Sequence, residues 1–268
     1  MLPLPTRSSL RPDAGAHRRF GALFCLGLVG VIAASASAVA GGGLPAPLAE
    51  LHPALVLALV SIQPAVFLGV AVAVGLVAAP RVGLKSRVRE LADGDGGAWA
   101  GFRSELRPAL GLGGIAGVAL LLAGWLVGPA GSVSGEGATV RSVLAAVPLR
   151  FLYGGITEEL LLRWGLMSAL AAIGRRMTGG ARGELTSGVA WAAILASAVL
   201  FGFGHLPTAV TLYGSLTPSV VAFVVLGNSL GGVAYGWLYW RHSLEAAMVG
   251  HAATHVVFVA VSLALVAA

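Results

Sequence analysis

The chain has 268 residues, of which 57% are hydrophobic and only 10% are charged. Soluble globular proteins average about 45–50% apolar and about 25% charged residues, so this composition excludes a water-soluble globule and predicts a membrane protein. The single cysteine, Cys25, excludes a disulfide framework and a cysteine-based zinc site, because both need at least two thiols. The net charge of +6 is compatible with either nucleic acid or anionic lipid as a partner.

Seven apolar runs follow one another along the chain, and a helix of about 20 such residues crosses about 30 Å of hydrocarbon. The runs are Phe20–Ala40, Pro53–Ala79, Ala109–Ala130, Ser142–Ile173, Thr186–His205, Pro218–Trp240 and Leu244–Val266. Loops are expected between several of them, notably at Gly128–Gly137 and Pro207–Thr217. The sequence therefore predicts an all-α, polytopic transmembrane helix bundle of about seven spans.

A basic leader, residues 1–19, precedes the first run. Together with the small residues from Ala34 to Ala40 it also resembles a secretory signal with a cleavage site, so retention and cleavage of the first run both stay open. The longest polar segment, residues 80–108, lies between the second and third runs. We expect residues 20–140 to form N-terminal transmembrane helices and residues 141–268 to form a C-terminal transmembrane domain.

The basic residues indicate how the chain lies in the membrane. If the N-terminus is cytoplasmic, 14 of the 17 Lys and Arg fall in the leader or in loops on the cytoplasmic side. The remaining three are Arg141, Arg150 and Arg163. This asymmetry follows the positive-inside rule and explains the excess charge by topology and by contact with anionic membrane lipid. We therefore expect an integral protein of a bacterial plasma membrane that binds no nucleic acid.

The fourth run contains charged side chains, and a carboxylate inside a span costs at least about 2.5–3.5 kcal/mol, so such residues are functional candidates. Glu159 and Arg163 stand at positions i and i+4, the spacing of a helical ion pair, which predicts a structural role for Glu159. Glu158 points elsewhere on the helix and lacks that partner, so it could accept a proton. The alternative is that both acids pair with basic residues and only fix helix packing.

Two further groups of polar residues lie in later runs. Phe201 and His205 share a helix face, and Pro207 follows closely. A lone histidine at a helix end is more often structural than catalytic. His251 and His255 also stand four residues apart, an arrangement that suits metal ligation or a shared proton network, although the glutamate of the HExxH metalloprotease helix is missing.

Taken together, the three groups resemble the signature of the CPBP intramembrane proteases. This family contains the type II CAAX prenyl endopeptidases and bacterial bacteriocin-processing or immunity-related proteins. The resemblance covers Leu149 to about Phe258, and the order and spacing of the motifs agree. The matching positions are Glu158, Glu159 and Arg163, then Phe201 and His205, then His251 and His255.

The resemblance implies a catalytic domain at residues 141–268, with its active site inside the bilayer. It assigns catalysis to Glu158, His205 and the third-motif histidine His251, and it makes Glu159, Arg163 and Phe201 supporting residues. His255 departs from the pattern, because the CAAX enzymes usually carry Asn there. An Asn amide donates a hydrogen bond in any protonation state, whereas a histidine donates according to its tautomer and charge.

The implied activity is endopeptidase cleavage of a membrane-associated protein or peptide, a substrate that the CAAX enzymes take in prenylated form. Glu158, assisted by His205, would deprotonate a water, while His251 and His255 would stabilise the oxyanion. In an equally compatible variant, zinc would bind His205, His251 and His255, with Glu158 as a fourth candidate ligand, and would activate the water.

Two other classes of function stay open: a non-catalytic membrane immunity or binding protein, and a small proton-coupled transporter that uses Glu158 and the histidines as a relay.

The expected depth of Glu158 in the membrane raises a separate question. Counting about 1.5 Å per residue from Arg175 puts Glu158 about 25 Å from the basic boundary, whereas a CAAX-type site should open to the cytosol. Either the segment from Ser142 is broken or re-entrant, or the substrate is not a CAAX protein.

Overall fold

The computed structural model describes residues 14–41, 46–129, 137–179, 181 and 184–267, and all regular structure among them is helical. The predicted leader lies outside the described residues up to position 13, as does most of the predicted loop at 128–137. The helices are α1 (Ala14–Ala40), α2 (Ala46–Ala49), α3 (Pro53–Ala78), η2 (Ala79–Val82), α4 (Arg87–Ala92), α5 (Ala98–Val127), α6 (Val140–Ala145), η3 (Leu149–Glu158), η4 (Leu160–Met167), α7 (Ser168–Met177), α8 (Ser187–Gly204), α9 (Leu206–Tyr213), α10 (Pro218–Arg241) and α11 (Leu244–Ala267).

Among the described residues, six helical segments are long and apolar enough to cross a membrane, roughly the number predicted. The fourth predicted run, which is not one of these six, forms η3, η4 and α7 in succession. The prediction of an all-α polytopic membrane bundle is therefore confirmed, and the chain is an integral membrane protein. Many apolar side chains, such as Ile115 at 68% exposure and Trp125 at 78%, face outward, as a lipid-facing surface requires.

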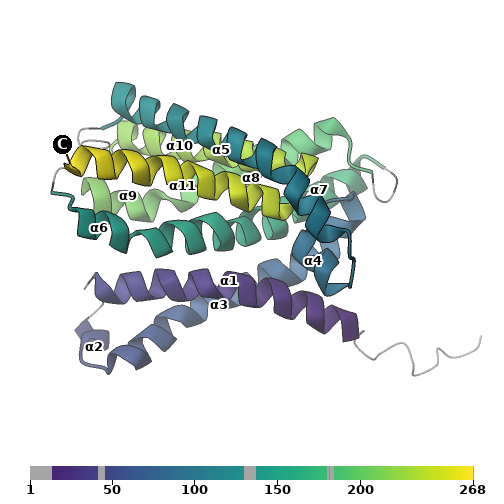
Figure 1. The fold of residues 1–268 in the computed structure, drawn as a ribbon, viewed down its shortest axis with the longest axis horizontal. Helices are drawn as coiled ribbons and strands as arrows, with labels where there is room; N and C mark the ends of the chain where they lie inside the picture. Colours follow the sequence, from purple (N-terminus) through teal and green to yellow (C-terminus); the bar gives the residue numbers. More distant parts are fainter. Residues whose placement is uncertain (1–13, 42–45, 130–136, 180, 182–183, 268) are drawn as a thin grey trace, which may run out of the picture.

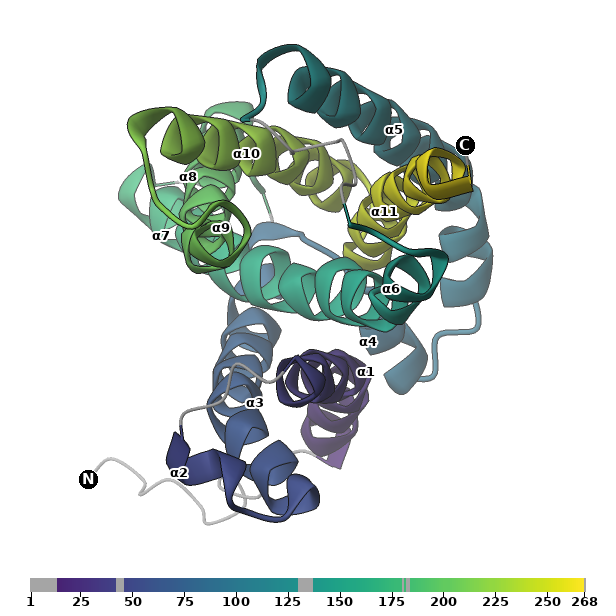
Figure 2. The same ribbon diagram turned by 90° about the vertical axis from the view of Figure 1, so that its left-hand side faces the viewer.

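The long helices form one bundle, with α1 and α3 set to one side of the others (Figures 1 and 2). Helix α5 packs along α11, α8 packs along α10, and α1 packs against both α3 and η3. Close approach of α5 and α11 depends on glycine, because a Cβ at Gly113 would overlap the carbonyl oxygen of Gly250. Small residues at such crossings are the usual means of packing helices in membranes.

Two helix boundaries differ from those that the sequence predicts. The polar segment expected to last until Pro108 ends earlier, because α5 begins at Ala98 and carries Pro108 in its interior. The first turns of α5 are stabilised by a buried carboxylate, Glu105, which has partners on neighbouring elements. After α8, the predicted break is itself helical, because Pro207 occupies the first turn of α9, where its missing N–H leaves no helical bond unmade.

The fourth predicted run is broken near Ala146 and then continues as two π-helical stretches, η3 and η4. π-helical hydrogen bonds run from i to i+5, and such segments are rare and are often found at functional sites. The wider turn brings residues four and five apart onto one face. Tyr153, Gly154 and Glu158 accordingly line the same cavity, and Thr157 faces away, donating a hydrogen bond to the carbonyl of Gly27 at 2.7 Å.

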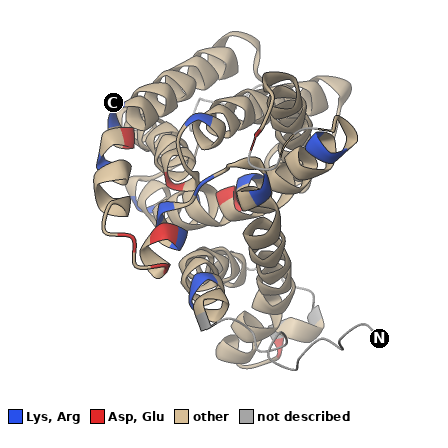
Figure 3. Cartoon of the chain, turned by 90° about the vertical axis from the view of Figure 1, so that its right-hand side faces the viewer, with Lys and Arg blue, Asp and Glu red and all other residues tan. Residues whose placement is uncertain are grey.

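Charged residues gather at one end of the bundle, where α3, α5 and α10 have their basic flanks (Figure 3). Arg87 pairs with Glu105 and with Glu90, and the hydroxyl of Ser243 donates to Glu105. The hydrogen bond that Arg87 donates to Glu105 raises the pKa of Arg87 above its ordinary value, although burial of the guanidinium lowers that pKa. We call this region the charged end.

At the same end, the buried carboxylate of Glu245 in the first turn of α11 accepts three hydrogen bonds. The donors are the Ser86 hydroxyl at 2.7 Å and the backbone amides of Arg87 at 2.7 Å and Val88 at 3.0 Å. A carboxylate that accepts the first amides of α4 satisfies donors that a helix start leaves unpaired. The charged end therefore ties α4 to α11, the helix that carries His251 and His255.

Candidate active site

The four predicted catalytic side chains meet in one cavity of about 250 Å³, here called the site cavity. Glu158 comes from the end of η3, His205 from the junction of α8 and α9, and the other two from α11. Three separate stretches of sequence thus supply one cluster. The four residues are Glu158, His205, His251 and His255.

Glu158 and His205 face each other across the site cavity. Oε1 of Glu158 lies 4.0 Å from Nε2 of His205, too far for a direct hydrogen bond and suited to a bridging water. The other ring nitrogen of His205, Nδ1, lies 2.9 Å from the carbonyl oxygen of Phe201. Because a carbonyl only accepts, this contact holds the proton on Nδ1 and turns the Nε2 lone pair toward Glu158.

Glu159 has a different environment although it is the next residue. Its side chain is fully buried, with Oε2 3.3 Å from Nε of Arg163 and Oε1 2.8 Å from Nδ1 of His251. The ion pair that the i, i+4 spacing predicts is present. The second contact was not predicted: Glu159 orients His251, holding a proton on Nδ1 so that Nε2 faces the site cavity.

Aromatic rings enclose this buried ionic group. The guanidinium carbon of Arg163 lies 4.9 Å from the ring centre of Phe201 and 5.4 Å from that of Tyr235, both within cation–π range. Arg163 also donates to the carbonyl of Gly232 at 3.0 Å. Tyr235 stacks on His251 with ring centres 4.4 Å apart. Glu159 and Arg163 therefore do not line the site cavity themselves but hold His251, which does.

His255 stacks on His251, with ring centres 4.8 Å apart, and its buried Nδ1 has no hydrogen-bond partner among the described residues. Its Nε2 lies beside Gly154, where a Cβ added to the glycine would come within 2.7 Å. Gly154 thus leaves room for the imidazole. With its proton on Nε2, a neutral His255 would present a donor to the cavity, as the Asn of the CAAX pattern does.

The histidines do not form a ready metal centre. Among the residues that the structure describes, no group of three or more His, Cys, Asp or Glu side chains is placed to hold a metal ion. The Nδ1 contacts of His251 with Glu159 and of His205 with Phe201 leave both Nε2 atoms free, as in histidines that bind a metal. Zinc binding therefore stays a prediction to be tested by metal analysis.

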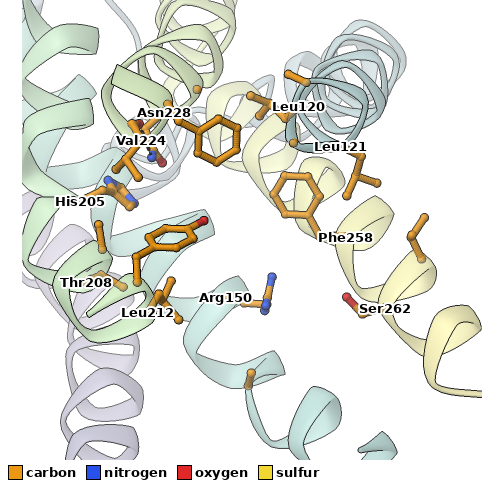
Figure 4. Close-up of a pocket in the computed structure, with 18 of the residues that line it drawn as sticks. Leu120, Leu121, Arg150, His205, Thr208, Leu212, Val224, Asn228, Phe258 and Ser262 are labelled. Carbon is orange, nitrogen blue, oxygen red and sulfur yellow. Dashed lines mark hydrogen bonds between the residues drawn. The ribbon is translucent and has the colours of Figure 1, made fainter. Parts of the chain in front are cut away.

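A second and larger cavity, of about 810 Å³, adjoins the site cavity (Figure 4). Arg150, His205 and Asn228 are among the residues that line both. Sequence reasoning noted Arg150 without assigning it a role, and it missed Asn228 and Tyr153 altogether. The signal that could have found Asn228 is the one used for Glu158, namely a polar side chain inside an apolar run.

The comparison with protein families agrees with the three motifs. The model of the family described as Type II CAAX prenyl endopeptidase Rce1-like matches residues 140–257. This match covers every motif residue from Glu158 to His255 and confirms the resemblance noted in the sequence. No curated protein and no solved structure matches the chain.

Proposed function

Since residues 140–257 belong to the type II CAAX prenyl endopeptidase family, we propose that this protein is an intramembrane endopeptidase. Its substrate is a membrane-associated protein or peptide, and Glu158, His205, His251 and His255 carry the reaction. The observation that carries the proposal is the convergence of these four side chains in one cavity, with Glu158 and His205 4.0 Å apart.

In the first step, a water between Glu158 and His205 loses a proton to Glu158 and attacks the scissile carbonyl carbon. His205 supports this step through Nε2, whose lone pair is directed toward Glu158 by the Phe201 contact. The proton held by Glu158 then passes to the leaving amine as the carbon–nitrogen bond breaks. A single carboxyl can serve as base and then as acid when its surroundings favour neither form strongly.

The oxyanion forms on the side of the cavity lined by α11. The Nε2 atoms of His251 and His255 both lie near Gly154. A neutral His255 with its proton on Nε2 donates one hydrogen bond, and His251 donates a second when it is protonated on both nitrogens beside the Glu159 carboxylate. Donors fixed in place before the reaction stabilise developing negative charge without reorganisation, often by several kcal/mol.

The test is a single substitution, Glu158→Gln, in the full chain reconstituted into liposomes. Peptide products are identified by mass spectrometry after incubation with a library of apolar peptides. We expect at least about a 100-fold loss of cleavage, because the base is removed while size is kept. Glu184→Gln, at an exposed position of the chain, serves as the matched control. Cleavage at the wild-type rate by Glu158→Gln would refute the assignment.

We also propose that the N-terminus is cytoplasmic and that the substrate reaches the site from the opposite side of the membrane. The large cavity is lined by the last turns of α5 and α11, by α9, and by the first half of α10. These segments lie away from the charged end, which the positive-inside rule places in the cytoplasm. The arrangement supports the sequence-based depth estimate for Glu158.

Labelling of single cysteines tests this orientation. With Cys25 changed to Ser, a cysteine at Leu212 beside the large cavity should react with a membrane-impermeant maleimide added outside intact cells. A cysteine at Lys85, at the charged end, should react only after lysis. The reverse pattern would overturn both the orientation and the side of access.

A further inference from the structure

Arg150 is a charged side chain in the wall of a largely apolar cavity. It lies near the start of η3, and the large cavity around it is lined mostly by Leu, Val, Ala and Phe side chains. In Figure 4 it stands between Leu212 on one side and Phe258 with Ser262 on the other. An arginine in such surroundings is energetically unfavourable unless something neutralises it.

Among the described residues, the Arg150 side chain has no hydrogen bond, ion pair or cation–π contact. Arg163, three turns deeper, shows the contrast: it has a carboxylate at 3.3 Å, a carbonyl at 3.0 Å and two aromatic rings. Arg163 is therefore held by groups of the protein, whereas no described residue binds the half-buried guanidinium of Arg150.

The position of Arg150 connects this unpaired charge to the reaction. Arg150 lines the site cavity as well as the large cavity, and it shares the η3 wall of the site cavity with Gly154 and Glu158. A group that binds the guanidinium therefore lies beside the cavity that contains the four proposed catalytic side chains. Its chemistry must be anionic, and the planar fork of an arginine matches a carboxylate through two parallel hydrogen bonds.

We propose that Arg150 is a specificity-determining residue that binds a carboxylate of the peptide substrate, preferentially the carboxylate at its chain end. This inference rests on the proposed function and extends it, because it names the chemical group by which the substrate is held. The large cavity is open on one side and largely apolar, so it can accommodate the last side chains of a peptide, and its volume of about 810 Å³ is within the range of ordinary ligand sites.

Binding is measured first, so that the result does not depend on turnover. The probes are the dansylated tripeptide leucyl-alanyl-leucine with a free carboxylate, the same peptide as its amide, and an amide in which aspartate replaces the central alanine. Dissociation constants are measured by fluorescence anisotropy for wild type, Arg150→Gln and Arg141→Gln in detergent micelles. Arg141 is the matched control, since it is an exposed arginine on the neighbouring helix α6.

We expect wild type and Arg141→Gln to bind the free carboxylate roughly ten- to hundredfold more tightly than the amide. Arg150→Gln should bind both equally, at the affinity that wild type has for the amide. Tight binding of the aspartate peptide would assign the site to acidic side chains in place of the chain end. Equal preference in wild type and Arg150→Gln would overturn the proposal.

A lipid could also supply the anion, and this outcome is separable. If Arg150→Gln loses a copurified anionic phospholipid and shows the same peptide discrimination as wild type, Arg150 holds lipid and the proposal is wrong. The cleavage assay is then repeated with the carboxylate and amide forms of the library. A wild type that discriminates in binding but cleaves nothing would contradict the protease assignment and leave the carboxylate site standing.

Discussion

The charged end and the site cavity both contain carboxylates that are largely removed from solvent. The two regions differ in the number of polar partners that surround these carboxylates. At the charged end, Glu245 accepts three hydrogen bonds and Glu105 is held by Arg87 and Ser243. In the site cavity, Glu158 faces His205 at 4.0 Å and has no closer polar partner among the described residues. A carboxylate with all its partners inside the protein is stabilised for structure, whereas one left facing a cavity remains able to react.

Glu159 shows that the behaviour of a carboxylate depends on the groups around it and not on how deep it lies in the bundle. It adjoins Glu158 in sequence, yet it is fully buried, forms an ion pair with Arg163 and is hydrogen-bonded to His251. It therefore behaves like the acids of the charged end while it supports a residue of the site. The comparison predicts that changing the satisfied acids lowers stability and changing the unsatisfied ones lowers activity.

The largest effect on stability is expected from Glu159→Gln. Removing one partner of a buried ion pair leaves Arg163 charged and uncompensated, which typically lowers the free energy of unfolding by about 3–5 kcal/mol. Thermal unfolding in detergent, followed by circular dichroism, measures the change, with Glu158→Gln as the matched variant one residue away. A Glu159→Gln protein as stable as wild type but slow in cleavage would break the comparison.

Gly154→Ala should impair activity more than stability. The added Cβ would lie 2.7 Å from Nε2 of His255 and would displace the imidazole. A shift of about 1 Å at a catalytic group can lower the rate by about 100-fold. Gly114→Ala on α5 is the control, because a Cβ there meets nothing within 4 Å. Cleavage at the wild-type rate by Gly154→Ala would show that His255 does not contribute where we place it.

A smaller effect is expected from Glu105→Gln at the charged end. The amide still bonds to Ser243 but loses its charge interaction with Arg87, so the free energy of unfolding should fall by about 1–3 kcal/mol. The cleavage rate at a temperature where both proteins are folded should not change. A large loss of activity without loss of stability would show that the charged end takes part in the reaction.

Metal removal should have the smallest effect. Because the proposed reaction uses Glu158 as the base and needs no metal ion, we expect chelation with EDTA or 1,10-phenanthroline to leave the cleavage rate unchanged. Elemental analysis of the purified protein supplies the second measurement. Stoichiometric zinc whose removal abolishes cleavage and whose return restores it would replace the glutamate mechanism with the metal-dependent one.

Much of the site could be predicted from local spacing. The Glu159–Arg163 pair and the shared face of Phe201 and His205 follow from helix geometry over four residues. The Glu159–His251 contact could not be predicted in this way, because its partners are 92 residues apart and the packing of η3 against α11 decides it. The role of Arg150 likewise depends on which helices enclose it.

The sequence by itself determined that this is a membrane protein of apolar helices and that three polar motifs interrupt them. Composition and residue spacing are local properties, and the energy of placing a charge in hydrocarbon makes them readable without a structure. The tertiary structure alone decided which charged side chains have oppositely charged neighbours. It placed Glu159 among partners, left Glu158 and Arg150 facing a cavity, and wound η3 as a π-helix, since these outcomes depend on helices that meet only after packing.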